Sequence, residues 1–209
     1  MQLNNHIFEP DLPHCRSYMT TRNTAFKSFI TDLLTQGHLI KMKQVHSENV
    51  VVIDQAPNHH ISSIPYTDAL ITNQKNVILS VKVADCCPIL ISHSSGWIAA
   101  IHAGRRGTQQ HIFYKTLKTL QTLTNDNKHF TCWLGPCLCS DCHEINPETH
   151  QCYDLHSENK HQFESLLSYS DNQLIIASHC TACSSNHHFF SYRKNNKTLH
   201  RNYCFIHRS

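Results

Sequence analysis

The sequence predicts an α/β (α+β) fold in which mixed β-sheets are covered by helices. Segments with helical periodicity alternate with short runs rich in valine and isoleucine. Two of these runs are joined by a tight turn, Ser94-Ser95-Gly96, so at least one strand pair is antiparallel. A length of 209 residues suits one hydrophobic core, and we expect a single domain over residues 1–209.

Three segments have the periodicity of amphipathic helices. Residues 23–36 place five apolar side chains on one helical face and end before Gly37, a residue suited to stop a helix. Residues 108–123 carry a second apolar stripe, and residues 161–167 predict a third helix. These helices are expected to lie on the faces of the sheets.

Strands are expected between and after the helices. Their residues are 40–45, 50–54, 69–72, 77–84, 89–93, 97–102, 130–134, 174–178, 189–192 and 202–206. The tight turn makes a hairpin of residues 88–93 and 97–102, so the outer ends of these two strands lie together.

Charge and hydropathy exclude several classes of protein. The chain has 18 basic and 15 acidic residues and a net charge of +3, too balanced for a nucleic-acid-binding face. The longest apolar run, residues 77–83, is far shorter than the roughly 20 residues of a membrane span. Residues 1–10 lack the basic flank and apolar stretch of a secretion signal, so we expect a cytoplasmic protein.

Histidine and cysteine are unusually abundant, with 19 and 11 residues. In a chain that is not exported, a high and odd number of cysteines indicates thiols, metal ligands or catalysis before disulfides. The composition therefore directs attention to metal chemistry.

The residues that carry chemistry gather where predicted strands end. They occupy residues 43–46, 84–88 and 102–108. The hairpin places Cys86, before its first strand, near His102 at the end of its second, and His46 can reach the same rim from a neighbouring strand. Two histidines and one cysteine suit zinc, and a fourth position left to water or substrate is the arrangement of a catalytic site.

The same residues allow plainer interpretations. Any one of 19 histidines can be a surface residue, and a cysteine on an apolar strand is usually a small core residue. Because neighbouring strand residues face opposite ways, only one of Cys86 and Cys87 can point into the site. Spacing alone leaves that choice open.

Residues 102–108 lead from a strand into a helix, where free backbone N–H groups and a positive dipole end attract anions. Gly104 and Gly107 let the backbone approach a ligand, and Arg106 or Arg105 can form paired hydrogen bonds to phosphate oxygens. The alternative is an ordinary connection with two solvated arginines. We take Gly104, Arg106 and Gly107 as the candidate phosphate-binding residues.

Asp85 stands beside the candidate cysteine ligand. A carboxylate at this position can orient a ligand histidine or move protons. It can equally accept hydrogen bonds from nearby backbone at the strand end. Asp85 joins Cys86 and His102 as a candidate catalytic residue.

An ordered set of motifs runs from about residue 40 to the C-terminus. The motifs are Gln44-Val45-His46, Asp68 to Thr72, Ala84-Asp85-Cys86, His102-Ala103-Gly104, Leu134 to Cys137 and Phe189 to Arg193. In this order they resemble the YfiH/YlmD-like family, also called the laccase-domain or peptidoglycan-editing-factor family and formerly multicopper polyphenol oxidoreductases. The resemblance implies a YfiH-like layered sandwich.

The resemblance also implies an activity and a set of ligands. The family's enzymes are purine nucleoside phosphorylases that transfer the sugar of adenosine, inosine and S-methyl-5'-thioadenosine to phosphate, and they can deaminate adenosine hydrolytically. Purine nucleosides and phosphate would be the partners of this chain. The implied cofactor is zinc, with copper the less favoured alternative, and the ligands are His46, Cys86 and His102. The motif alignment selects Cys86 over Cys87.

The sequence departs from the family pattern at three positions. Ser47 stands where glycine is frequent, Cys87 where leucine is usual, and Arg105 where tryptophan is usual. The tryptophan-to-arginine change alters the wall of the candidate anion site. The family's N-terminal motif is only faintly matched by Thr20-Thr21-Arg22.

Other functions remain open from the sequence. Cys86 and His102 also suit a cysteine hydrolase, with the thiol as nucleophile and the imidazole as base. Copper-dependent phenol oxidation needs more clustered histidines than three motifs supply. A non-catalytic role in peptidoglycan editing is neither supported nor opposed by the residues.

A second metal site is a further alternative. Cys139-x-x-Cys142 and Cys180-x-x-Cys183 have the spacing of a four-cysteine structural zinc site. Such a site would favour a metal-stapled binding module over an enzyme. The first pair lies in a segment that resembles the family's Leu-Gly-Pro-Cys loop, where no such site is expected.

Overall fold

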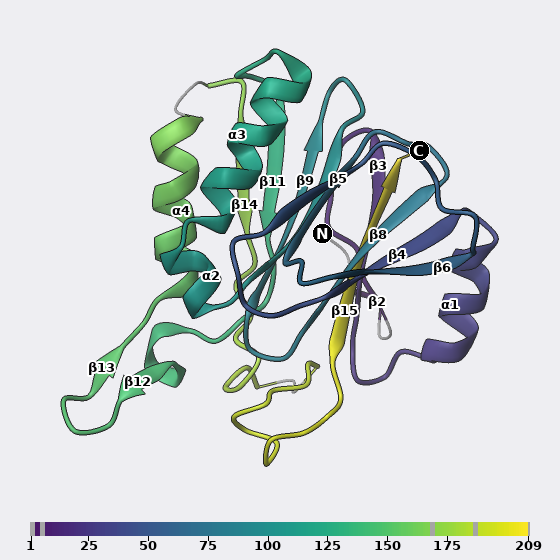
Figure 1. Ribbon diagram of the computed structural model, residues 1–209. Coiled ribbons are helices and arrows are strands. Elements are labelled where there is room, and N and C mark those ends of the chain that lie inside the picture. Colours follow the sequence, from purple (N-terminus) through teal and green to yellow (C-terminus); the bar gives the residue numbers. More distant parts are fainter. Residues whose placement is uncertain (1–2, 5–6, 168–169, 186–187, 209) are drawn as a thin grey trace.

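The computed structural model describes residues 3–4, 7–167, 170–185 and 188–208 and consists of two large β-sheets with helices on their outer faces (Figure 1). The larger sheet has seven strands in the order β1-β2-β3-β15-β8-β4-β6. The smaller has six strands in the order β14-β11-β9-β10-β7-β5. Both sheets contain parallel and antiparallel pairs, which confirms the predicted mixed α+β class.

The strands of the larger sheet are β1 (Leu3–Asn4), β2 (Ile7–Phe8), β3 (Cys15–Thr20), β15 (Asn202–Arg208), β8 (Val77–Val83), β4 (His38–Lys43) and β6 (Ile61–Pro65). Those of the smaller sheet are β14 (Gln173–Ile176), β11 (Phe130–Leu134), β9 (Cys87–His93), β10 (Ile98–Ala103), β7 (Ala69–Thr72) and β5 (Val50–Ile53). A separate two-stranded ribbon is formed by β12 (Glu144–Asn146) and β13 (Gln151–Cys152). The helices are α1 (Phe26–Leu34), α2 (Arg105–Gln109), α3 (Ile112–Thr124), α4 (Leu155–Leu166) and the short 3₁₀ helix η1 (Ser140–Cys142).

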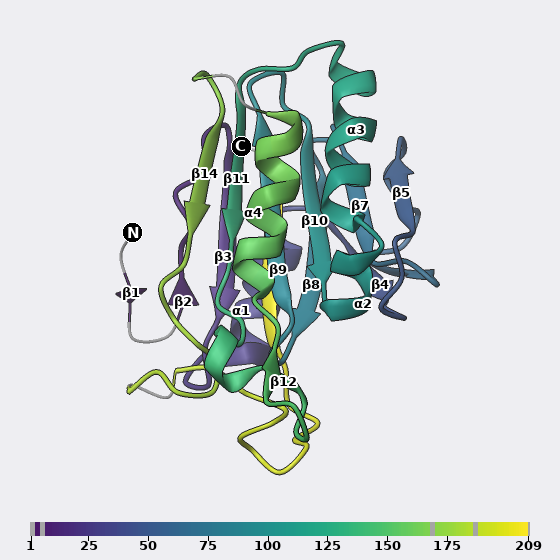
Figure 2. The ribbon, with the colours of Figure 1, turned by 90° about the vertical axis from the view of Figure 1, so that its left-hand side faces the viewer.

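Three apolar clusters hold the layers together. One lies between the two sheets and includes Leu79 of one sheet and Leu90 of the other. A second lies between the smaller sheet and helices α3 and α4, which cover its outer face (Figure 2). A third joins α1, through Leu33, to the larger sheet. Among the helices that the structure describes, none is long and apolar enough to cross a membrane.

The predicted hairpin is confirmed. Strands β9 and β10 pair antiparallel, with Pro88 opposite His102 and Cys87 opposite Ala103. The register brings Cys86, the residue before β9, to the end of β10. The hairpin therefore creates the closeness of Cys86 and His102 that the sequence predicted.

All three helical predictions differ from the structure in their bounds. The helix expected at residues 23–36 is the shorter α1. The helix expected at residues 108–123 is two helices, α2 and α3, separated at His111, whose φ of 62° lies in the left-handed region. Helix α4 begins at Leu155, earlier than expected, because Asp154 caps it by accepting a hydrogen bond from Ser157 N at 2.9 Å. The apolar periodicity indicated the helices but did not contain the break or the cap.

The strand predicted at residues 189–192 was wrong. This segment has no strand pairing. The side chain of Asn202 accepts a hydrogen bond from Phe190 N and donates one to the Phe190 carbonyl, each at 2.8 Å, and these bonds replace those of a neighbouring strand. Conversely, β3 and β6 were not expected, since their sequences mix apolar with polar residues that face solvent or a neighbouring turn. The ribbon of β12 and β13 and the short β1 and β2 also went unpredicted.

Candidate metal centre and pocket

His46, Cys86 and His102 meet at one point between the two sheets, and we call them the pocket site. His46 follows β4, Cys86 precedes β9, and His102 lies near the end of β10. One donor atom from each lies within 4.8 Å of the other two. Cys86 Sγ is 3.9 Å from His46 Nε2, and the two imidazole rings are 4.7 Å apart and nearly perpendicular. The structure thus brings together the three residues that the sequence singled out.

A fully buried carboxylate, Asp68, supports the pocket site from behind. Its Oδ1 lies 2.8 Å from His102 Nδ1. It also accepts hydrogen bonds from the backbone N–H groups of residues 45–47 and from Ser47 Oγ, at distances of 2.8 to 3.1 Å. With Nδ1 engaged by Asp68, the Nε2 atom of His102 is left to face the other two donors.

Asp68 was part of a sequence motif but had no role in the sequence prediction. It precedes β7, and β7 pairs with β10 so that Ala69 stands opposite Ile101. The next step of this ladder places Asp68 beside His102, whose N–H donates to the Asp68 carbonyl at 2.7 Å. A prediction of the β7–β10 pairing would have found it, but the order of strands in a sheet is not contained in local periodicity.

Burial and charge together set the protonation of the pocket site. Burial raises the pKa of the Cys86 thiol, but the charges and hydrogen bonds of His102 and His46 outweigh it and bring this pKa to about 6. Burial lowers the pKa of His102, but Cys86 and Asp68 outweigh it and raise that pKa to about 9. Burial likewise opposes the charge of Asp68, yet hydrogen bonds from His102 and Ser47 hold its pKa well below its ordinary value.

The donor set fits zinc. It offers two imidazoles and a thiol with a lowered pKa, and a buried carboxylate orients one imidazole, which is the usual support of a histidine ligand. The site also has no room for larger side chains at Gly104. A Cβ there would lie 2.9 Å from Cys86 Sγ and 3.0 Å from His46 Cδ2, so glycine permits the close approach of two donors.

The pocket site opens onto a cavity of about 500 Å³. Its lining residues are Gln44, His46, Lys82, Val83, Ala84, Asp85, Cys86, His102, Arg105, Leu138, His143, Leu155, Tyr192, Arg193 and Arg201. Four of them are lysine or arginine and one is aspartate, so the wall is basic. The cavity is large enough for a nucleoside-sized ligand.

Only some residues of the predicted anion-binding turn line this cavity. Both Arg105 and Arg106 of the short helix α2 are exposed, but only Arg105 lines the cavity. Gly104 is the N-cap residue of α2. Gly107 is buried, and a Cβ there would lie 2.9 Å from the carbonyl oxygen of Ser47. Close packing therefore accounts for glycine at both positions, whether or not a phosphate binds there.

Asp85 lines the cavity and holds two neighbouring segments. Its carboxylate accepts hydrogen bonds from Thr181 Oγ1 and from the backbone N–H of Arg193, both at 2.8 Å. Its carbonyl accepts from Leu138 N at 3.0 Å, and its φ is 93°, a strained value for a residue with a side chain. In this arrangement the carboxylate that contacts a histidine of the pocket site is Asp68.

The sequence alone assigned no role to the cavity residues from the second half of the chain, although Tyr192 and Arg193 belong to one of its motifs. His143 is 8% exposed and lines the cavity, and its Nδ1 has no hydrogen-bond partner among the residues that the structure describes. Burial lowers its pKa, and the nearby charge of Arg193 lowers it further, so the imidazole is neutral at pH 7. Tyr192 and Arg201 also lie on the cavity wall. Only the fold brings these residues to the cavity.

A family model described as multi-copper polyphenol oxidoreductase laccase matches residues 21–168, a range that contains all three residues of the pocket site. The chain belongs to this laccase family, whose members include the YfiH/YlmD-like proteins.

Members of the laccase family with curated names are similar to this chain over different lengths. A purine nucleoside phosphorylase of Campylobacter jejuni is 30% identical over 167 residues, which cover 75% of this chain and 72% of that protein. One from Clostridium acetobutylicum is 28% identical over 181 residues, covering 79% and 75%. One from Corynebacterium glutamicum is 43% identical over 91 residues, but this match spans only 37% of that protein.

Solved structures of the laccase family share the fold. YlmD from Geobacillus stearothermophilus has a TM-score of 0.86 at 20% identity, with 100% of this chain and 98% of that chain covered. YfiH from Bacillus licheniformis has a TM-score of 0.82 at 17% identity, with 99% and 97% covered. The layered sandwich that the sequence motifs implied is therefore the fold of the chain.

The three departures from the laccase-family pattern have distinct places in the structure. Ser47 donates two hydrogen bonds to Asp68 and so adds to the support of the pocket site. Cys87 is fully buried in the apolar cluster between the smaller sheet and its helices, on the side away from the cavity. Arg105 adds a positive charge to the cavity wall.

Proposed function

We propose that the chain is a zinc-dependent purine nucleoside phosphorylase that acts on adenosine, inosine and S-methyl-5'-thioadenosine with phosphate and also deaminates adenosine. Two relatives that are similar to this chain over most of their length are named purine nucleoside phosphorylase. The observation that carries the proposal is the pocket site itself, three zinc-type donors at the edge of a basic cavity of about 500 Å³.

His46, Cys86 and His102 would hold the zinc ion and leave one coordination position toward the cavity. When bound, the ion would supply a Lewis acid beside the substrate. Asp68 fixes the ring of His102 and balances its charge. The chain's contribution at this point is a donor set held in place by buried hydrogen bonds.

Phosphorolysis requires a phosphate oxygen to attack the sugar C1′ while the bond from C1′ to the purine nitrogen breaks and its electron pair leaves with the base. Arg105, Arg193 and Arg201 give the cavity the positive charge that would bind the phosphate dianion and hold it for this attack. His143 offers a neutral imidazole that can form one hydrogen bond to the nucleoside. Asp85 holds the backbone of Arg193 and so positions its side chain.

Deamination is the second activity that we propose for this cavity. A water oxygen bonds to purine C6, and ammonia leaves with the electron pair of the carbon–nitrogen bond. Both reactions need the nucleoside to lie between the pocket site and the basic wall, and the cavity has the volume for this.

A cysteine hydrolase is the second candidate function, and one observation favours it. Without metal, the pKa of Cys86 is about 6 and that of His102 about 9, so at pH 7 the pair is a thiolate and an imidazolium. A thiolate in this state can attack an electrophilic carbon, with His102 protonating the leaving group. Zinc and this chemistry need the same thiolate, so they exclude one another.

The deciding experiment measures zinc content and the release of purine from inosine and adenosine, with and without phosphate. Wild type should bind zinc and release purine only with phosphate, and Cys86→Ala should lose both the pocket zinc and turnover. The exposed Cys152 provides the control, because Cys152→Ala should keep both. Metal-free wild type that turns over no nucleoside, and whose Cys86 is alkylated by iodoacetamide faster than Cys152, would favour the hydrolase.

The position of phosphate can be tested on two adjacent arginines. Arg105→Ala removes a cavity charge and should raise the KM for phosphate by about tenfold or more, the value of a hydrogen bond between charged groups. Arg106→Ala is the matched control on the same helix and should leave this KM nearly unchanged. If Arg106→Ala raises this KM and Arg105→Ala does not, the phosphate binds at the turn residues Gly104, Arg106 and Gly107 instead.

A further inference from the structure

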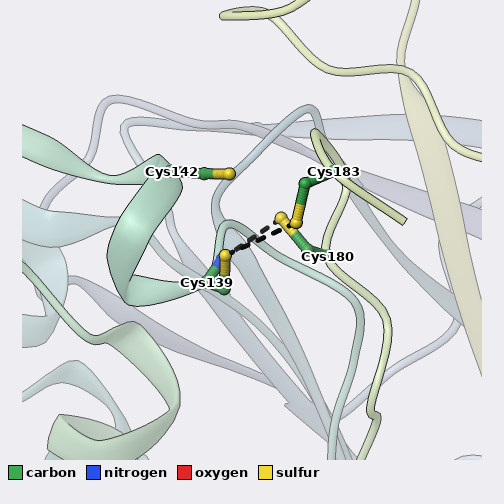
Figure 3. A group of neighbouring side chains, drawn as sticks. All are labelled: Cys139, Cys142, Cys180 and Cys183. Carbon is green, nitrogen blue, oxygen red and sulfur yellow. Dashed lines mark hydrogen bonds between the residues drawn. The ribbon is translucent and has the colours of Figure 1, made fainter. Parts of the chain in front are cut away.

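Two loops far apart in the sequence bring together four cysteines, none of which belongs to the pocket site (Figure 3). Cys139 and Cys142 lie in the loop after β11, and Cys180 and Cys183 lie in the loop after β14. All four Sγ atoms lie within 4.8 Å of one another. We call these residues the four-cysteine cluster.

The spacing of the sulfur atoms matches a metal cage. Cys139 Sγ and Cys183 Sγ are 3.7 Å apart, whereas a disulfide bond measures about 2.05 Å. Four thiolates placed tetrahedrally about 2.3 Å from a zinc ion are about 3.8 Å from one another. All of the chain's cysteines are free in the structure, so no thiol of the cluster is used elsewhere.

The backbone around the cluster is arranged as in thiolate sites. Cys180 Sγ accepts hydrogen bonds from Cys139 N at 3.3 Å and from Ala182 N at 3.4 Å. Cys139 to Cys142 form a tight turn, closed by a hydrogen bond from Cys142 N to the Cys139 carbonyl at 3.1 Å. Backbone N–H groups directed at sulfur favour the thiolate, the form that binds metal.

The two loops are also joined to each other independently of the sulfur atoms. Cys137 and Cys180 form a parallel bridge, and Thr181 N donates to the Cys137 carbonyl at 2.9 Å. Beneath the sulfurs lies a small apolar cluster that includes Leu138 and Ala182. This cluster is far smaller than the two on either face of the smaller sheet, so a metal ion would be a main support of these loops.

The loops that carry the cluster form part of the cavity wall. Thr181, between the two cysteines of the second loop, donates a hydrogen bond to Asp85. Leu138 lines the cavity next to Cys139. Arg193, another lining residue, donates a hydrogen bond from its guanidinium to the Cys142 carbonyl at 3.2 Å. Holding the four sulfurs together therefore also holds one wall of the cavity.

We propose that Cys139, Cys142, Cys180 and Cys183 bind a structural zinc ion that joins the two loops and fixes the wall of the cavity. Four thiolates close the coordination shell and leave no position for substrate, which makes this a structural site and not a catalytic one. The inference does not depend on the proposed activity, because the four-cysteine cluster shares no ligand with the pocket site.

The test is a zinc count on protein purified from zinc-containing medium under reducing conditions. Wild type should hold two zinc ions per chain, Cys183→Ser and Cys86→Ala one each, and the double variant none. Cys152→Ser is the control, since it removes an exposed thiol outside both sites and should keep two. X-ray absorption at the zinc edge of Cys86→Ala should then show four sulfur neighbours at about 2.3 Å.

A readout on the wild type covers the case in which Cys183→Ser does not fold. With zinc bound, the four cysteines should resist alkylation at least tenfold more than Cys152, and a strong chelator should abolish this protection. A Cys86→Ala protein free of zinc, or a disulfide between Cys139 and Cys183 in protein kept under reducing conditions, would overturn the proposal.

Discussion

The pocket site and the four-cysteine cluster are both groups of metal-type donors, yet they are built in opposite ways. The pocket site has three donors, one open side and a cavity of about 500 Å³ lined with positive charge. The four-cysteine cluster has four donors, each close enough to the others to surround one ion. Three donors with an open side suit chemistry, whereas four donors suit a structural support.

The two sites also differ in what holds their ligands. The residues of the pocket site are at the ends of β4, β9 and β10, and Asp68 fixes one of them and the backbone beside another. The four cysteines are on loops whose own apolar cluster is small. The pocket site is therefore preorganised by the fold, whereas the cysteine loops have few apolar contacts of their own and would gain most from a bound ion.

The largest expected difference between the sites is that one variant, Cys86→Ala, mainly loses activity, whereas another, Cys183→Ser, mainly loses stability. Cys86→Ala should lower kcat/KM by more than about 100-fold, beyond the loss typical of residues that only support a ligand. It should lower the unfolding free energy less than Cys183→Ser does, because the buried hydrogen bonds of Asp68 still hold the pocket site without its ion. Cys183→Ser should lower the unfolding free energy by about 3 kcal/mol, because it removes a bound ion from loops with little other support. Nucleoside kinetics and urea unfolding of both variants check this. Equal losses of activity and stability in both would break the comparison.

Asp68→Asn tests whether the pocket site is preorganised by its buried carboxylate. The amide removes the negative charge that faces His102 and puts an NH₂ group among five donors, so zinc affinity should fall by about 10–100-fold. The unfolding free energy should fall by about 3 kcal/mol, as when one partner of a buried ion pair is lost. Chelator competition and urea unfolding measure the two effects.

Two controls accompany this prediction. Asp32→Asn, on an exposed face of α1, should change neither quantity. Because the pKa of Asp68 is held below its ordinary value, its stabilisation is present above about pH 4 and lost as the pH falls below that value. The stability difference between wild type and Asp68→Asn should therefore shrink in acid, and a constant difference would contradict the argument.

Gly104→Ala tests the close packing of donors in the pocket site. The added methyl group would lie 2.9 Å from Cys86 Sγ, so the thiol or His46 must move, and zinc affinity should fall by about tenfold. Gly37→Ala is the matched control, since its methyl group meets the backbone of Asn76, far from either site. It should reduce stability without changing zinc affinity. If both substitutions weaken zinc equally, the effect is not local.

The last prediction concerns the pH dependence of zinc binding at the pocket site, measured in Cys183→Ser so that only this site is counted. Zinc must displace the proton of His102, whose pKa without metal is about 9. Affinity should rise about tenfold per pH unit from about pH 6.5 to 9, and more steeply below pH 6, where Cys86 is also protonated. Chelator competition across this range checks the slope, and a flat profile would show that His102 is not protonated in the free site.

Much of the fold was predictable because it is encoded locally. The apolar periodicity of residues 23–36 predicted α1, and the turn at residues 94–96 predicted the hairpin of β9 and β10. That hairpin accounts for the closeness of Cys86 and His102. Where short-range polar contacts decide the conformation, prediction was wrong: Asn202 replaces strand pairing at residues 189–192, and His111 divides the expected helix.

The sequence by itself determined the α+β class, the hairpin and the two paired cysteine motifs, because each depends on periodicity or spacing along a short stretch of chain. The three donors of the pocket site came from the resemblance of its motifs to the family. Only the tertiary structure decided that Asp68 supports His102, that Arg105 and not Arg106 faces the cavity, and that the two cysteine pairs meet. These facts depend on the order of strands in the sheets and on loops that meet across long separations in sequence. No local pattern carries that information.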